Sequence, residues 1–154
     1  MPRLCANLSM LFTEHAFLDR FALAARTGFR GVEFLFPYAF DSTEIKARLQ
    51  HHGLTQVLFN LPPGDWDNGE RGIACLPDRR EEFRAGVATA IEYAKVLGNT
   101  RINCLAGIAP SGSDPQQVQQ TLVDNLRYAS EALGVHGIRL VMEMINTRDM
   151  PGFY

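Results

Sequence analysis

The chain has 154 residues, 46% hydrophobic and 21% charged, which is enough for one soluble globular domain with a buried core. The net charge of −2 disfavours nucleic-acid binding, because such proteins usually carry a basic surface that displaces counterions. No apolar run approaches the roughly 20 residues of a membrane span, and the N-terminus does not read as a secretory signal. The three widely spaced cysteines predict free thiols in a reducing, cytoplasmic setting.

Five β-rich runs alternate with helical patterns along the chain. The runs span residues 4–8, 31–36, 54–61, 101–106 and 139–145. The helical patterns begin near Phe17, Thr43, Asp78 and Asp114, and each ends close to a glycine. Strands that alternate with helices form βαβ units and a parallel sheet. The sequence therefore predicts an α/β fold with about five parallel strands and four helices.

The last two helices have the clearest start signals. Asp78 is predicted to cap the third helix, with the acid Glu81 three residues on. Asp114 is predicted to cap the fourth, with Pro115 at the first helical position. The apolar positions predicted to face the core from the fourth helix are Val118, Leu122, Leu126, Ala129 and Leu133.

Residues 62–77 form the one long stretch without a repeating pattern, and they are rich in Gly, Pro, Asp and Asn. A loop of about 15 residues is long for a compact domain, and such loops often have a functional role. This one follows the third predicted strand.

One polar residue lies near the C-terminal end of each predicted strand. These residues are Asn7, Glu33, Asn60, Asn103 and Glu143. Strand residues alternate between faces, so these five point away from the larger apolar residues, into a barrel interior. They either satisfy one another and the rim loops, or form a site at the strand ends, where (β/α) barrels carry their active sites. A carboxylate in that place is a natural proton acceptor, which favours Glu143 as a catalytic base.

Several nucleotide and metal motifs are absent from the sequence. There is no G-x-G-x-x-G after a strand, no P-loop and no G-x-S-x-G elbow. The four histidines lack the spacing of a metal site, so no metal ligand is assigned among them. Dinucleotide and nucleoside triphosphate chemistry is therefore not supported.

Long motifs occur at residues 6–12 (ANLSMLF), 28–38, 59–66 (FNLPPGDW), 69–75, 98–107 and 143–153. They resemble those of hydroxypyruvate isomerases, in the xylose isomerase-like barrel superfamily; Met144 stands where that family often has proline. Eight-stranded barrels typically need about 250 residues. The resemblance therefore implies a partial TIM (β/α)8 barrel, with residues 1–154 as the N-terminal portion of one apparently truncated domain.

The resemblance implies interconversion of hydroxypyruvate and 2-hydroxy-3-oxopropanoate (tartronate semialdehyde) through an enediolate, with Glu143 in the acid/base pair. No redox cofactor is required. The second glutamate, and the ligands of any divalent metal, would lie beyond Tyr154. The substrate, a small hydroxy-oxo acid, is expected to contact the other strand-end residues, with Asn60 and Asn103 holding its oxygens. Arg71 would bind its carboxylate, unless it is simply a solvated loop arginine.

Three alternatives remain open. The first is 2-oxo-tetronate as the substrate within the same family. The second is a metal-dependent endonuclease of the endonuclease IV type, which the lack of strand-end histidines and the slight negative charge disfavour. The third is that the 154-residue chain alone is inactive and self-associates, as a homo-oligomer or aggregate, because five strands of a barrel leave two open edges.

Overall fold

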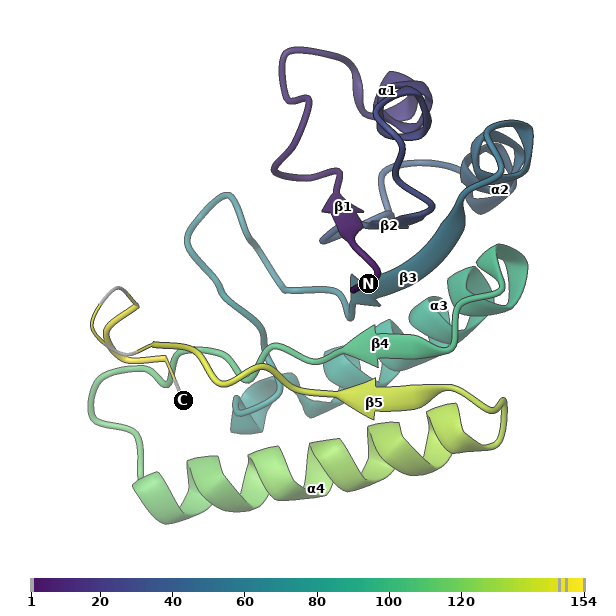
Figure 1. Cartoon of the computed structure of the whole chain (residues 1–154). Helices are drawn as coiled ribbons and strands as arrows, with labels where there is room; N and C mark the ends of the chain where they lie inside the picture. Colours follow the sequence, from purple (N-terminus) through teal and green to yellow (C-terminus); the bar gives the residue numbers. More distant parts are fainter. Residues whose placement is uncertain (1, 147, 149, 154) are drawn as a thin grey trace.

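Five parallel strands form one sheet in the computed structural model, which describes residues 2–146, 148 and 150–153. The strands lie in the order β1 to β5, so each pairs with its neighbour in sequence, as in a barrel (Figure 1). Their bounds are Cys5–Asn7 (β1), Gly31–Glu33 (β2), Thr55–Asn60 (β3), Arg101–Asn103 (β4) and Arg139–Val141 (β5). The predicted partial barrel is confirmed, although the strands end earlier than predicted.

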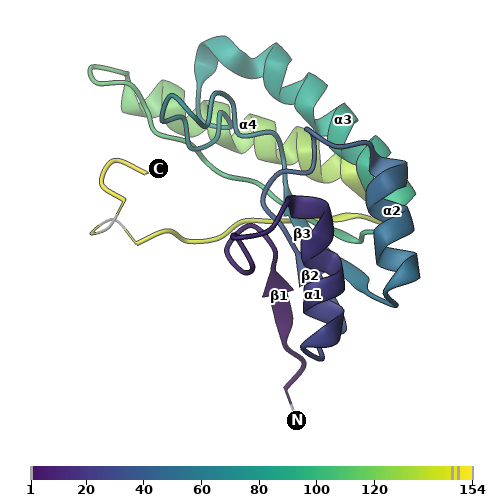
Figure 2. The ribbon, with the colours of Figure 1, turned by 90° about the horizontal axis from the view of Figure 1, so that it is seen from above.

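The helices form an outer arc around this sheet, and the long loops gather at the carboxyl ends of the strands (Figures 1 and 2). The helices are η1 (Phe17–Asp19), α1 (Arg20–Arg26), α2 (Ser42–His51), η2 (Pro77–Arg79), α3 (Arg80–Leu97) and α4 (Pro115–Gly134). Successive helices pack side by side, α1 on α2, α2 on α3 and α3 on α4. No helix in the described part of the chain is long and apolar enough to cross a membrane.

One of the two predicted helix caps is present. The Asp114 side chain accepts a hydrogen bond from the Gln116 backbone N–H at 3.0 Å, with Pro115 first in α4, as predicted. The predicted cap at Asp78 is wrong. Asp78 lies inside the 3-10 turn η2, which begins at Pro77. Helix α3 therefore begins at Arg80, and it has no side-chain cap.

The two faces of the sheet differ in composition, as strand alternation requires. Ala6, Val32, Phe59 and Ile102 are fully buried under the helices. The burial of these four apolar residues agrees with the predicted helix-covered face. Strand alternation then places their neighbours, the polar residues Asn7, Glu33, Asn60 and Asn103, on the opposite, interior face.

The buried face of α4 is rotated from the predicted one. Val118, Ala129 and Leu133 are buried as predicted, but Leu122 and Leu126 are only half-buried. Thr121 and Asn125 are buried in the same helix because they meet polar groups of α3 and of the loop before it.

Candidate active site

Four of the five predicted site residues are the last residues of their strands. Asn7 ends β1, Glu33 ends β2, Asn60 ends β3 and Asn103 ends β4. The register sets Asn7 beside Glu33 and Asn60 beside Asn103. A register shift between β2 and β3 sets Glu33 beside Leu58, two residues before Asn60. The parallel sheet therefore brings these side chains to its carboxyl edge as a stepped row of two pairs, at the end where barrel enzymes carry their active sites.

Asn7 and Glu33 form the first pair in this row. Asn7 Nδ2 donates to Glu33 Oε1 at 3.1 Å, and Asn7 Oδ1 accepts from the Ser9 backbone N–H at 3.0 Å. The Ser9 hydroxyl oxygen in turn accepts from the Leu35 N–H at 2.9 Å. Both ends of the Asn7 amide are thus used, which fixes the orientation of the Glu33 carboxylate.

Asn60 and Asn103 form the second pair, and both are 5% exposed. Asn103 Nδ2 donates to Asn60 Oδ1 at 3.1 Å. Within the described residues, Asn60 Nδ2 and Asn103 Oδ1 make no further hydrogen bond, and neither atom is fully enclosed. The pair therefore offers one donor and one acceptor at the sheet edge.

Glu143 lies two residues beyond β5, rather than inside a strand as predicted. The last register pair sets Asn103 beside Val141, and the Cys104 N–H donates to the Val141 carbonyl at 2.9 Å. Continued alternation from Val141 would carry Glu143 to the same face, one step past the row. Its side chain is exposed and, among described residues, has no hydrogen-bond or ion-pair partner. Its catalytic role stays a prediction.

Arg71 lies in the long loop after β3, packed on the only tryptophan of the chain. Its guanidinium carbon is 4.1 Å from the Trp66 ring centroid, and the Trp66 ring meets that of Phe36 edge-on at 4.9 Å. Arg71 Nη1 donates to the carbonyls of Trp66 at 3.0 Å and Glu70 at 2.8 Å. In the described part of the chain, its Nε and Nη2 groups make no hydrogen bond, which leaves one edge of the guanidinium open.

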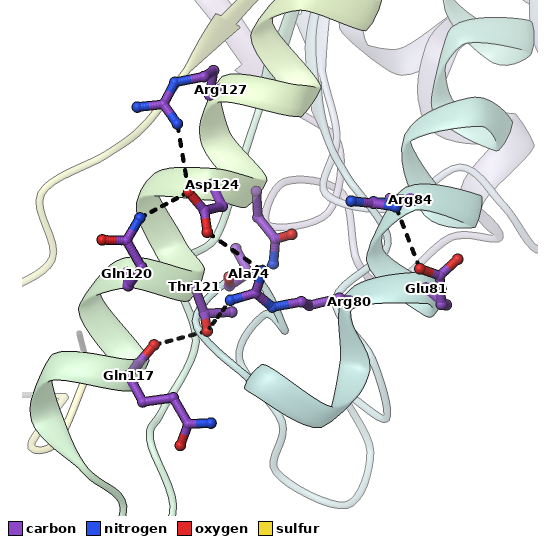
Figure 3. Close-up of polar contacts among 10 residues, drawn as sticks. Ala74, Arg80, Glu81, Arg84, Gln117, Gln120, Thr121, Asp124 and Arg127 are labelled. Atoms are coloured by element: carbon purple, nitrogen blue, oxygen red, sulfur yellow. Dashed lines mark hydrogen bonds and ion pairs between the residues drawn. The ribbon is translucent and has the colours of Figure 1, made fainter.

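The end of this loop is fixed to the segment after β4 and to α4. The Cys75 N–H donates to the Ala106 carbonyl, and buried Asn125 donates from Nδ2 to the Ala74 carbonyl at 2.8 Å. Figure 3 shows Ala74 beside a polar cluster between α3 and α4, in which Arg80 donates to the Thr121 hydroxyl at 2.9 Å. The sequence analysis did not single out Asn125. Its position could have done so, because Asn125 follows Leu122 by three residues and therefore lies near the apolar side of the helix.

Two cavities lie at different positions relative to the row of strand-end polar residues. The larger, of about 880 Å³, lies at the amino ends of the strands and is lined by residues such as Cys5, Gly31 and Arg101. None of the strand-end polar residues lines it. The smaller, of about 240 Å³, lies between the loops after β3 and β4, and Arg71 and Ile108 line it. The strand-end polar residues do not line this cavity either, and Arg71 is the one predicted site residue that does.

Metal ligands were not expected in this chain. Among the described side chains, no group of three or more His, Cys, Asp or Glu residues could hold a metal ion. The cysteines Cys5, Cys75 and Cys104 are free thiols, and burial raises the pKa of Cys104 to about 12.

Comparison with known proteins gives one family. The model described as a xylose isomerase-like TIM barrel matches residues 21–153. Two similar relatives are the hydroxypyruvate isomerase of Escherichia coli, 56% identical, and the 2-oxo-tetronate isomerase of Cupriavidus necator, 53% identical. Each alignment covers all of this chain. The chain spans 60% of the first relative and 59% of the second.

A solved structure from Brucella melitensis, described as an AP endonuclease of family 2, is 50% identical and superposes with a TM-score of 0.95. The match covers 99% of this chain and 59% of the other. Both comparisons thus align the chain with somewhat more than half of longer proteins.

Proposed function

This chain belongs to the xylose isomerase-like TIM barrel family, and we propose that it supplies part of the active site of an isomerase of hydroxypyruvate and tartronate semialdehyde. The observation that carries the proposal is the row of polar side chains, one at the end of each of four consecutive strands, with a carboxylate just after the fifth. The hydroxypyruvate isomerase of Escherichia coli, similar over the whole chain, supports the choice of reaction.

The reaction needs a base and a way to hold a developing enediolate. Hydroxypyruvate loses a proton from C3, and electrons move toward the C2 carbonyl oxygen to give an enediolate. A proton returns to C2, and the proton of the C3 hydroxyl passes to the C2 oxygen, so that C3 becomes the aldehyde and C2 carries the hydroxyl. In this proposal Glu143 removes the C3 proton, and a second carboxylate outside this chain manages the proton at C2. No redox cofactor takes part.

The row supplies groups suited to the rest of the substrate. The free Asn60 Nδ2 group donates a hydrogen bond to the oxygen that gains charge in the enediolate. Glu33, held by Asn7, accepts a hydrogen bond from a substrate hydroxyl. The open edge of Arg71 matches the geometry of a carboxylate, because its two N–H groups lie parallel.

A 2-oxo-tetronate is the second candidate substrate, because the relative from Cupriavidus necator carries that name. It shares the carboxylate and the neighbouring oxo group, so the same residues would act on it.

The free cysteines fit a reducing compartment such as the cytoplasm.

The test joins residues 1–154 to the C-terminal part of the Escherichia coli relative that lies beyond the match. The chimera is assayed with hydroxypyruvate, with a 2-oxo-tetronate, and with DNA containing an abasic site at low salt. The proposal predicts turnover of a hydroxy-oxo acid by the chimera, none by the 154-residue chain alone, and no cleavage of the DNA. A folded chimera that cleaves abasic DNA and leaves both acids unchanged would overturn it.

A further inference from the structure

Arg79, in the turn η2, joins two carboxylates from different parts of the fold. Its Nη1 lies 2.7 Å from Glu70 Oε1 and its Nη2 lies 3.4 Å from Glu70 Oε2. Its Nε and Nη2 groups also donate to Glu82, in the first turn of α3. Arg79 thereby connects the loop after β3 to the start of a helix.

Glu70 carries this connection into the loop. Its Oε2 atom also accepts a hydrogen bond from the Asp65 backbone N–H, and the Glu70 N–H donates to the Asp65 carbonyl at 3.0 Å. Gly64 lies against this carboxylate with a positive φ of 80°, and a Cβ there would overlap Glu70 Oε2. The Glu70 carboxylate therefore lies between the backbone of residues 64–65 and Arg79, and is partly exposed to solvent.

The same loop turn sets the position of Arg71. The carbonyls that hold Arg71 Nη1 belong to Glu70 and Trp66, which flank the turn that the Glu70 carboxylate closes. Movement of this turn would displace both carbonyls, and with them the open Nε and Nη2 edge.

We infer that Arg79 is a positioning residue, which acts through Glu70 to hold the open edge of Arg71 toward an anionic carboxylate substrate. The inference rests on the proposed function for the carboxylate, but the ordering of the loop by Arg79 stands independently of it. A partly exposed ion pair contributes little to global stability. The effect therefore falls on the orientation of Arg71, because residues 61–76 have no helix or strand to hold them.

The first experiment measures loop order directly, by hydrogen exchange of the whole chain at backbone amides of Gly69, Glu70 and Gly72. These amides are bonded inside the loop, to the carbonyls of Trp66, Asp65 and Pro63. Arg79→Ala should speed their exchange by about tenfold, and Arg79→Lys, which keeps the charge, by less. The matched control is Arg84→Ala in the following helix α3, which removes an exposed pair with Glu81 and should leave the loop unchanged. Equal exchange in Arg79→Ala and the control overturns the inference.

The second experiment measures binding in the chimera described above. Arg79→Ala should raise KM about tenfold with kcat within twofold, and Arg79→Lys should recover part of the loss. The double variant Arg71→Ala/Arg79→Ala should be no worse than Arg71→Ala alone, because Arg79 acts only through Arg71. Fully additive effects would overturn the positioning role. If the chimera turns over neither acid, but Arg79→Ala still speeds hydrogen exchange in the loop, the result counts against the proposed function alone. The ordering of the loop by Arg79 would then stand.

Discussion

One side of the Arg71 guanidinium is hydrogen-bonded within the protein, and the other side has no hydrogen-bond partner among the described residues. Two backbone carbonyls occupy Nη1, and the Trp66 ring supports the plane of the group. This pre-organisation lowers the entropy lost when a carboxylate binds. Sequence alone predicted only that a loop arginine would bind the carboxylate; which of its nitrogens remain free depends on the path of the loop backbone.

Arg71→Ala tests the carboxylate contact in the chimera. Loss of a charge-assisted pair should raise KM for either acid about tenfold or more, with a smaller change in kcat. Steady-state kinetics on both acids provide the measurement, and Arg84→Ala is again the control. An unchanged KM would return Arg71 to the role of a solvated loop arginine.

The pKa of Glu70 reports the contact with Arg79. Hydrogen bonds from Arg79, and then from the Asp65 N–H, lower this pKa below its ordinary value of 4.5. The pair therefore contributes stability above pH 4.5, and this contribution is lost as the pH falls through the lowered pKa. In Arg79→Ala, the pKa of Glu70 should rise toward the ordinary value, as measured by carbon-13 NMR of its carboxyl group. If the pKa of Glu70 is the same in Arg79→Ala as in the unaltered chain, Arg79 does not hold the Glu70 carboxylate.

At the level of elements, periodicity predicted the order of strands and helices and the strand-end position of four site residues. It placed Glu143 inside a strand, because the apolar run continues past Val141 although regular pairing ends there. The local structure of residues 62–77 could not be predicted, because it depends on the contact of Glu70 with Arg79 and on that of Ala74 with Asn125, which is distant in sequence.

The close approach of the loop to the segment after β4 gives a prediction for two glycines. Gly72 has a φ of 106°, and a Cβ there would overlap the Leu105 carbonyl, whereas Gly69, with a φ of 95°, has open space around it. Gly69→Ala should cost about 1 kcal/mol, from backbone strain alone. Gly72→Ala should cost about 2 kcal/mol or more, because overlap adds to strain. Urea unfolding measures the difference, and equal costs would contradict the observed packing of the loop.

At the scale of the whole molecule, the sheet has two open edges, at β1 and β5. Several large apolar side chains are also exposed: Leu4 is 71% exposed, Met10 67%, Val135 82% and Met144 91%. Unpaired edges and apolar surface favour association with other chains.

We therefore expect the 154-residue chain alone to self-associate. Light scattering after gel filtration should give a mass well above 17.2 kDa, whereas the chimera should lack this behaviour at the same concentration. A stable monomer of the chain with isomerase activity would contradict this expectation.

The most direct test of the proposed chemistry is the turnover number of the Glu143→Gln chimera on hydroxypyruvate. Glutamine keeps the shape of the side chain but does not accept a proton, so kcat should fall by about 100- to 10,000-fold. The matched control is Glu131→Gln, an exposed carboxylate on α4, which should leave kcat unchanged. A Glu143→Gln enzyme that turns over as fast as this control would contradict the assignment of the base.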